Sequence, residues 1–178
     1  MIRRRIVSPA VIALGSNLGD REANLRRAIG AIDGIDGVAV TAASGIVESR
    51  AIKPEGVDAA APSYLNAVAL IESELPPEPL LDELNRIETE YGRVRHERWG
   101  DRTLDLDIVA FGGLTLESER LTLPHPRAWQ RAFVIVPWLQ VDPDAVLAGH
   151  GRVEALEAAT SSEVWSFAAA PLLDGAQP

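Results

Sequence analysis

The sequence predicts an α+β protein whose core has the ferredoxin-like element order βαββαβ. Four segments have the length and apolar character of strands, and two of the intervals between them carry apolar residues at helical spacing. The predicted strands cover residues 10–14, 38–47, 64–72 and 103–111. One helix follows the first strand and the other follows the third, so the two middle strands are joined without a helix.

The first strand and its helix have clear boundaries in the sequence. Residues 10–14 form an apolar run that ends at Gly15, and Asp20 can cap the helix that follows. The buried stripe of this helix is predicted to consist of Leu25, Ala28, Ile29 and Ile32. Glycines at 34 and 37 end the helix.

The second half of the core begins after a proline-containing segment. Residues 49–62 hold two prolines and an alanine run, which predicts a long loop of a kind that often serves a function. Prolines at 76, 77 and 79 open the second helix, because proline is tolerated in the first turn. Its buried stripe is predicted to be Leu80, Leu84, Ile87 and Tyr91. An arginine-rich loop over 92–102 leads into the last strand.

The remaining residues add smaller elements to one domain, 1–178. We expect short helical stretches near 127–140 and 154–158, and loosely ordered ends over 1–9 and 168–178. A length of 178 residues suits a single domain, and no linker is long enough to divide the chain.

The composition argues against several classes of protein. The chain has no cysteine, so it has no disulfide and no thiolate metal site. A net charge of −9 argues against general nucleic-acid binding, which requires broad neutralisation of phosphates. The apolar stretch after the first arginines is too short for a secretory signal or a membrane span, so we expect a cytoplasmic protein.

Two carboxylates on the fourth strand carry the main chemical signal. Alternation directs Leu104, Leu106 and Ile108 into the core and turns Asp105 and Asp107 to the other face. Adjacent carboxylates repel each other unless a cation lies between them, and Mg²⁺ is commonly held by one or two carboxylates together with phosphate oxygens. The alternative is a polar strand face exposed to water.

The loop before these carboxylates is basic within an acidic chain. Four arginines against Glu97 and Asp101 give it a net charge of +2; they are Arg93, Arg95, Arg98 and Arg102. Guanidinium groups bind phosphate oxygens in bidentate fashion, so the loop and the carboxylates suit a metal-bound polyphosphate. The alternative is a solvated charged loop, because sixteen of the seventeen basic residues in this chain are arginine.

Several other residues have both a functional and a structural interpretation. Trp99 could stack on a base or anchor its loop, and His125, between two prolines, could bind phosphate or be structural. Tyr64 and Asn66 share a strand face that suits a flat, hydrogen-bonding heterocycle or a cross-strand pair. The tight turn at 15–19 lacks the Lys-Ser/Thr of a P-loop and is interpreted as a structural turn.

The same residues resemble one family of enzymes, the 6-hydroxymethyl-7,8-dihydropterin pyrophosphokinases. The motifs that carry the resemblance occur in order: ALGSNLGD at 13–20, YLN at 64–66, GRVR at 92–95, RWG at 98–100, RTLDLDI at 102–108 and LPHP at 123–126. The resemblance covers about residues 10–142. The most specific part is the block that joins RWG to RTLDLD.

The resemblance implies a reaction and a set of roles. ATP would give its diphosphate to the hydroxymethyl group of a reduced pterin, with AMP as the other product, in folate biosynthesis. Asp105 and Asp107 would hold two Mg²⁺ ions and would form the catalytic group together with Arg93 and Arg102. Pterin contacts would come from Asn17, Ser49, Tyr64, Asn66 and Phe133. ATP contacts would come from Asn85, Glu88, Arg95, Arg98, Trp99, Arg102, Ile108, Thr122, His125 and Arg131. We expect a monomer that binds ATP and a reduced pterin, with no nucleic acid or membrane as partner.

The chain departs from the family pattern in two loops. Residues 49–56 lack the usual Thr-x-Pro-x-Gly, with Ser49 in place of the threonine, and Asp101 stands where a proline is usual. Neither change touches the metal pair. Two other functions fit the residues alone: a γ-phosphoryl kinase or nucleotidyltransferase, which would release ADP or pyrophosphate, and a non-catalytic ferredoxin-like binding module.

Overall fold

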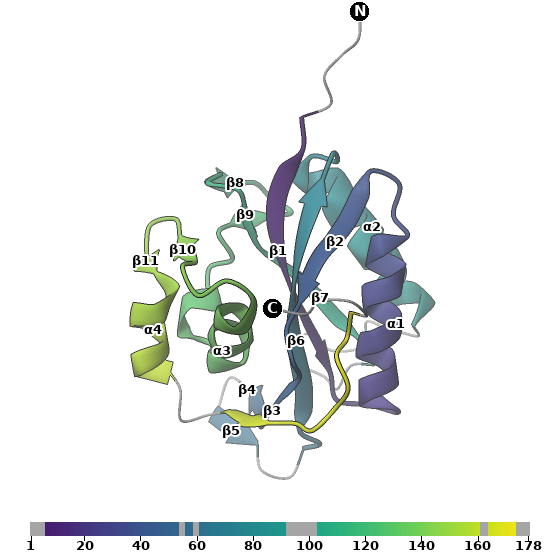
Figure 1. The fold of residues 1–178 in the computed structure, drawn as a ribbon, viewed down its shortest axis with the longest axis vertical. Coiled ribbons are helices and arrows are strands. Elements are labelled where there is room, and N and C mark those ends of the chain that lie inside the picture. The colour runs from purple at the N-terminus through teal and green to yellow at the C-terminus, as the bar shows by residue number, and fades with distance from the viewer. Residues whose placement is uncertain (1–5, 54–55, 59–60, 92–102, 161–163, 174–178) are drawn as a thin grey trace, which may run out of the picture.

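The computed structural model describes residues 6–53, 56–58, 61–91, 103–160 and 164–173. A six-stranded antiparallel sheet forms the centre of the molecule, with helices on both faces (Figure 1). Within the described part of the chain, no helix is long and apolar enough to cross a membrane.

The main sheet contains β1 (Ser8–Ser16), β2 (Val38–Ala43), β3 (Val47–Ser49), β6 (Tyr64–Ser73), β7 (Asp105–Phe111) and β12 (Val164–Ser166). The helices are α1 (Arg21–Asp33), α2 (Pro77–Glu90), α3 (Ala132–Val141) and α4 (Val153–Thr160), and a short 3-10 helix, η1 (Ala128–Gln130), precedes α3. Three small hairpins complete the structure: β4 (Ala51–Lys53) with β5 (Gly56–Asp58), β8 (Leu116–Glu117) with β9 (Thr122–Leu123), and β10 (Val146–Leu147) with β11 (Gly151–Arg152).

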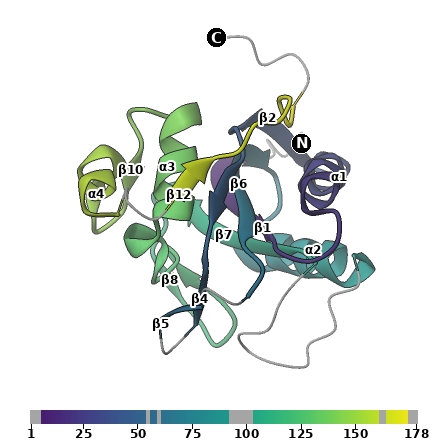
Figure 2. The same cartoon turned by 90° about the horizontal axis from the view of Figure 1, so that it is seen from below.

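Strand β1 lies inside the sheet, antiparallel to β6 on one side and to β7 on the other. The far side of β6 is shared by two strands, because β3 pairs with its first residues and β2 with its last. Strand β12 pairs with β3 as the outermost strand. Figure 2 shows β12 beside α3. Two connections cross the sheet through a helix, β1 to β2 through α1 and β6 to β7 through α2.

The two faces of the sheet bury different clusters of side chains. Ile12 and Leu14 of β1 pack with α1 and α2, whereas Val11, which points to the opposite face, packs with Ile135 and Trp138 of α3. Helices α1 and α2 therefore lie on one face of the sheet and α3 on the other, as Figure 1 shows. Both faces are apolar along much of the sheet, which leaves polar side chains to gather near its ends.

The helix predictions are confirmed in detail. The Asp20 side chain caps α1 by accepting a hydrogen bond from the Ala23 amide at 3.1 Å. The predicted stripe residues of both helices are buried against the sheet: Leu25, Ala28, Ile29 and Ile32 on α1, and Leu80, Leu84 and Ile87 on α2. Tyr91 follows α2 as its C-cap and is partly buried beside the same cluster.

The region between the first helix and the third predicted strand differs from expectation. The predicted strand 38–47 is interrupted between Ala43 and Val47, where the Ser44 hydroxyl accepts the Val68 amide hydrogen at 2.9 Å. The predicted loop 49–62 contains the hairpin of β4 and β5, so the expectation of a segment without secondary structure was wrong. Both prolines of this segment, Pro54 and Pro62, lie outside the paired residues of β4 and β5, and composition alone does not reveal this arrangement.

The C-terminal segment is also better held than its composition suggests. Arg26 of α1 donates hydrogen bonds to the carbonyls of Ala170 and Pro171 at 2.6 and 2.7 Å, and Leu172 is buried in the α1–α2 cluster. The expectation of a loose end from residue 168 was therefore wrong up to residue 173. At the other end, β1 begins at Ser8, inside the segment 1–9 predicted to be loose.

We expect Leu172→Ala to lower the free energy of unfolding by about 2 kcal/mol, since it removes a buried leucine side chain from the core. Urea titration followed by circular dichroism measures this change. The matched control is Leu114→Ala on an exposed turn, which should change stability by less than about 0.5 kcal/mol. Equal stabilities of the two variants would contradict the packing of the C-terminal segment.

Candidate active site

Asp105 and Asp107 project from β7 on the face of the sheet that carries α3. Leu104, Leu106 and Ile108 are buried on the opposite face, in the cluster under α1 and α2, as the alternation predicts. Both carboxylates are partly exposed, with 40% of the Asp107 side chain accessible to solvent. Two accessible carboxylates on one strand face provide the hard oxygen ligands that Mg²⁺ prefers.

A buried carboxylate of α2 stabilises strand β7. Glu88 of α2 is 1% exposed, and its Oε1 accepts the amide hydrogen of Leu106 at 2.7 Å. Leu106 lies between the two aspartates, so this bond fixes the segment that carries them. Burying a carboxylate is costly unless hydrogen bonds compensate, and a backbone amide directed at an anion is a strong compensating bond.

Gly15 lies between the carboxylates and a second group of polar side chains. In the register of the sheet it pairs with Asp105 of β7 on one side and with Asn66 of β6 on the other. Paired residues of antiparallel strands point to the same face, so Asp105 and Asn66 flank Gly15 two strand spacings apart, roughly 10 Å. A Cβ at Gly15 would lie 3.3 Å from Asn66 Oδ1 and 3.6 Å from the Tyr64 ring. Because Gly15 has no side chain, nothing projects from β1 between the two polar groups. We call the surface formed by Gly15 between Asp105 and Asn66 the floor of the site.

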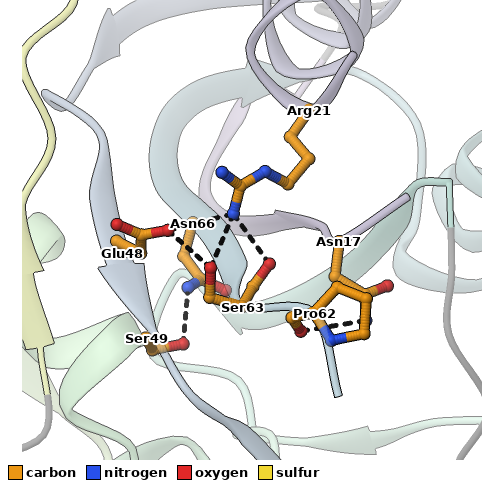
Figure 3. A network of polar contacts seen from close by, with 7 residues as sticks. All are labelled: Asn17, Arg21, Glu48, Ser49, Pro62, Ser63 and Asn66. Atoms are coloured by element: carbon orange, nitrogen blue, oxygen red, sulfur yellow. Dashed lines mark hydrogen bonds and ion pairs between the residues drawn. The ribbon is translucent and has the colours of Figure 1, made fainter. Parts of the chain in front are cut away.

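The second polar group consists of residues predicted to line a pterin pocket. Asn66 Nδ2 donates a hydrogen bond to Ser49 Oγ at 2.9 Å, and both side chains are buried (Figure 3). Tyr64 pairs with Ser49 across β3 and β6 and is only partly buried. Asn17, in the turn after β1, is buried and donates to the Pro62 carbonyl at 3.4 Å. The structure thus brings Asn17, Ser49, Tyr64 and Asn66 together.

His125 lies beside the carboxylates as a neutral imidazole. Burial, followed by the charge of the Arg131 guanidinium, lowers the pKa of His125 to about 4. Its Nδ1 accepts the Arg127 amide hydrogen at 3.1 Å, which places the ring proton on Nε2. Nε2 lies 3.8 Å from Asp107 Oδ2. At pH 7 this is a contact between a dipole and a charge, and His125 can offer a hydrogen bond at the carboxylate side of the site.

Helix α3 adds a cation and an aromatic ring from the same side. The Arg131 guanidinium lies over the Phe133 ring, 5.5 Å from its centroid. Phe133 is partly buried at the margin of the α3 cluster. Its ring is therefore held by packing on one side and by Arg131 on the other.

The remaining predicted residues have different positions. Ile108 is buried in the core, so any contact with a nucleotide would have to come from its main chain. Thr122 is exposed on β9, and Asn85 is partly buried on α2, one turn before Glu88. Arg93, Arg95, Arg98, Trp99 and Arg102 lie outside the described residues.

Two functional features were missed in the sequence. The segment 15–19 was interpreted as a structural turn, whereas Gly15 belongs to β1 and separates Asp105 from Asn66. Glu88 was predicted to lie near ATP, and no feature of the sequence indicated its bond to Leu106. The position of Gly15 could have been found only from the pairing of three strands, which are distant in the chain.

Curated relatives share most of their length with this chain. A protein of Haemophilus influenzae is 47% identical over 138 residues, which cover 78% of this chain and 84% of the relative. Proteins of Bacillus subtilis and Synechocystis sp. are 43% identical over 132 residues and 38% identical over 161 residues; these cover 74% and 89% of this chain and 77% and 80% of the relatives. All three are named 2-amino-4-hydroxy-6-hydroxymethyldihydropteridine pyrophosphokinase.

Solved structures with the same fold are much more distant in sequence. A crystal structure of Plasmodium falciparum HPPK-DHPS has a TM-score of 0.65 and 12% identity, with 86% of this chain covered. The wild-type form with pterin and p-hydroxybenzoate has a TM-score of 0.63 and 14% identity, with 87% of this chain covered. The chain spans a little under half of each of these proteins, 45% and 43% of their length.

A family model described as 7,8-dihydro-6-hydroxymethylpterin-pyrophosphokinase (HPPK) matches residues 11–143, a segment that contains the carboxylate pair, the Asn66 group and His125. This chain belongs to the HPPK family.

Proposed function

We propose that this protein transfers the diphosphate of ATP to the hydroxymethyl group of 6-hydroxymethyl-7,8-dihydropterin, giving AMP and the pterin diphosphate, a step of folate biosynthesis. Membership of the HPPK family supports the reaction. The observation that supports the proposal within the molecule is the pairing of Gly15 with both Asp105 and Asn66. Through this pairing the carboxylates that we assign to the metal and the residues that we assign to the pterin share one face of the sheet.

The pterin is assigned to the group around Asn66. A pterin is flat and has hydrogen-bonding atoms along its edges, so it suits amide and hydroxyl groups beside aromatic rings. Asn17, Ser49 and Asn66 would supply the polar contacts, and Tyr64 and Phe133 the flat apolar ones. Asn66 is held by its bond to Ser49, so its amide has a defined orientation before the substrate arrives.

The phosphates of ATP are assigned to the β7 side of the floor. Asp105 and Asp107 would hold two Mg²⁺ ions, which would neutralise phosphate charge and orient the diphosphate when bound. His125 would donate from Nε2 to a phosphate oxygen, and Arg131 would add a positive charge. Arg93, Arg95, Arg98 and Arg102 are assigned to the phosphates, and Asn85, Glu88, Trp99, Ile108 and Thr122 to the surroundings of ATP, on the resemblance to the family alone.

The reaction itself requires alignment more than covalent participation by the protein. The pterin hydroxymethyl oxygen forms a bond to the β-phosphorus of ATP, and the bond from that phosphorus to the bridging oxygen of AMP breaks. The electron pair of the broken bond leaves with AMP, and the hydroxyl proton passes to solvent. The chain's contribution is to hold the two substrates on one floor and to balance the phosphate charge.

We also propose that residues 1–178 form one domain with a ferredoxin-like core. The strand order β7-β1-β6-β2 and the two helical crossovers on one face support the core, and β12 with Leu172 ties the C-terminal segment to it. The sequence also predicts that the protein is a monomer and acts in the cytoplasm, and both points stay predictions.

The first test is the identity of the products. We expect the purified protein, given ATP, Mg²⁺ and 6-hydroxymethyl-7,8-dihydropterin, to form AMP and pterin diphosphate in equal amounts, and only when metal is present. Chromatography of the nucleotides measures this. ADP would indicate a γ-phosphoryl kinase and pyrophosphate a nucleotidyltransferase; a protein that binds both substrates without turnover would be a binding module.

The metal pair is tested by Asp107→Asn. Loss of groups that only support a metal ligand typically costs 10- to 100-fold, so loss of a ligand should reduce kcat/KM by more than about 100-fold. The melting temperature should not fall, because the change removes repulsion between neighbouring carboxylates. Asp144→Asn is the control, since its side chain is 90% exposed and pairs with Arg152. A wild-type rate for Asp107→Asn would contradict the assignment.

The floor of the site is tested by Gly15→Ala. The added methyl carbon would lie 3.3 Å from Asn66 Oδ1, so Asn66 must shift by a few tenths of an ångström. Overpacking of this kind costs about 1–3 kcal/mol, and we expect the KM for the pterin to rise roughly tenfold. Gly113→Ala is the control, because a Cβ there would meet no atom within 4 Å. Equal pterin KM values for both variants would exclude Gly15 from the site.

A further inference from the structure

A compact charged network lies behind the Asn66 group, and it involves residues that no role has been assigned to above. Arg21, the first residue of α1, reaches β3 and the start of β6 (Figure 3). Its Nη1 lies 3.0 Å from Glu48 Oε1, 2.9 Å from the Ser63 carbonyl oxygen and 2.8 Å from Ser63 Oγ. The Ser63 hydroxyl also donates to Glu48 Oε1 at 2.5 Å. One guanidinium nitrogen thus connects three segments that are distant in the chain.

The position of Arg21 is unfavourable for a helix considered alone. The N-terminus of a helix carries a partial positive charge, so a cation in the first turn is destabilising. Glu48 supplies the opposite charge: the Ser63 hydroxyl, together with the Arg21 guanidinium, holds the pKa of the Glu48 carboxyl below its usual value. The two side chains are 28% and 33% exposed, so the pair is less screened than an ion pair on the open surface.

Each member of the network lies within a few positions in the sequence of a residue assigned to the pterin. Glu48 precedes Ser49 on β3, Ser63 precedes Tyr64 at the start of β6, and Arg21 follows the turn that contains Asn17. The network does not share a face with those residues. Glu48 pairs with Leu65, which is buried under α1, whereas Ser49 pairs with Tyr64 on the other face. Arg21, Glu48 and Ser63 therefore lie on the side of the sheet opposite Ser49, Tyr64 and Asn66, away from the pterin position proposed above.

The carboxylate pair is held by a different contact. Glu88 of α2 fixes β7 at Leu106, and no bond of this contact passes through Arg21. The metal half of the site, around Asp105 and Asp107, is also held by Ser16 and Asn24, which donate to the Thr103 carbonyl at 2.6 and 3.2 Å. The bonds of Arg21 go instead to Glu48 and Ser63, in the pterin half around Asn66. A change at Arg21 should disturb one half and leave the other in place.

We propose that Arg21 is a positioning residue for the pterin: its bonds to Glu48 and Ser63 set the spacing of Asn17, Ser49 and Asn66, and through them the affinity for the pterin. This inference rests on the proposed function and extends it to a residue outside the substrate's reach. Through Arg21, one side chain fixes the start of α1, strand β3 and the residue before β6 relative to one another.

The test is Arg21→Gln, which keeps much of the side chain and removes the charge. Hydrogen bonds made by a charged guanidinium are stronger than those between neutral groups, so we expect the KM for the pterin to rise roughly tenfold. The KM for ATP and kcat at saturating pterin should stay within about twofold of wild type, because the metal half is unchanged. Arg152→Gln is the matched control: it removes an exposed arginine that pairs with Asp144 and Glu154, and it should leave all three values unchanged.

Two further variants separate positioning from simple stability. Arg21→Lys retains the charge near Glu48 and should recover part of the pterin affinity. Glu48→Gln combined with Arg21→Gln should raise the pterin KM by no more than the larger single change, because residues of one network are not additive. Calorimetric titration of 6-hydroxymethyl-7,8-dihydropterin, with a non-hydrolysable ATP analogue present, gives the same comparison without turnover.

The outcomes are distinguishable from failure of the proposed function itself. An inactive wild-type protein that binds no pterin would overturn the function. An active wild type with an unchanged pterin KM in Arg21→Gln would overturn only the positioning role. Equal rises in the KM for ATP and for the pterin, or a lower melting temperature with both KM values unchanged, would also reject it, since either result describes a general structural contact.

Discussion

The pairing of β1 with β6 on one side and β7 on the other is the constraint on which the rest of the structure depends. This register makes Gly15 the common neighbour of Asp105 and Asn66, and it determines which side chains share the face under α3. A slip of one residue would turn every side chain of the shifted strand to the other face. The packing of Ile12 and Leu14 against α1 and α2 opposes this, because a slip would remove both side chains from that cluster and turn them toward α3.

Around this floor, the protein uses charge in two distinct ways. Glu88 and Glu48 both accept hydrogen bonds from within the fold. Glu88 accepts from a backbone amide, and Glu48 accepts from the Arg21 guanidinium and the Ser63 hydroxyl. Glu88 is buried, which is costly for a carboxylate and is tolerated because its hydrogen bond is made within the fold. Asp105 and Asp107 instead face the accessible side of β7, where neighbouring carboxylates favour a cation. Strong internal hydrogen bonds thus hold the strands and helices together, and the carboxylates that we propose as metal ligands lie on the partly exposed face of β7.

The predictions from sequence succeeded where one local pattern determines the outcome. Helical spacing identified the buried stripes of α1 and α2, and strand alternation separated Leu106 from its neighbouring aspartates. Composition failed where pairing decides, as in the hairpin of β4 and β5 and in β12, which joins the sheet through residues near the end of the chain. The predicted pterin residues Asn17, Ser49, Tyr64 and Asn66 came from the family resemblance, and their grouping became visible only in the structure.

The sequence by itself determined the order of the core elements, their buried faces and the carboxylate pair, because these depend on residues within one or two turns or along one strand. Family membership also follows from sequence, since motifs such as RTLDLDI carry it without reference to position in space. Only the tertiary structure decided that Gly15 separates the two halves of the site and that Arg21 holds one of them. These relations join segments up to about ninety residues apart, and local propensity contains no information on which distant strands will meet.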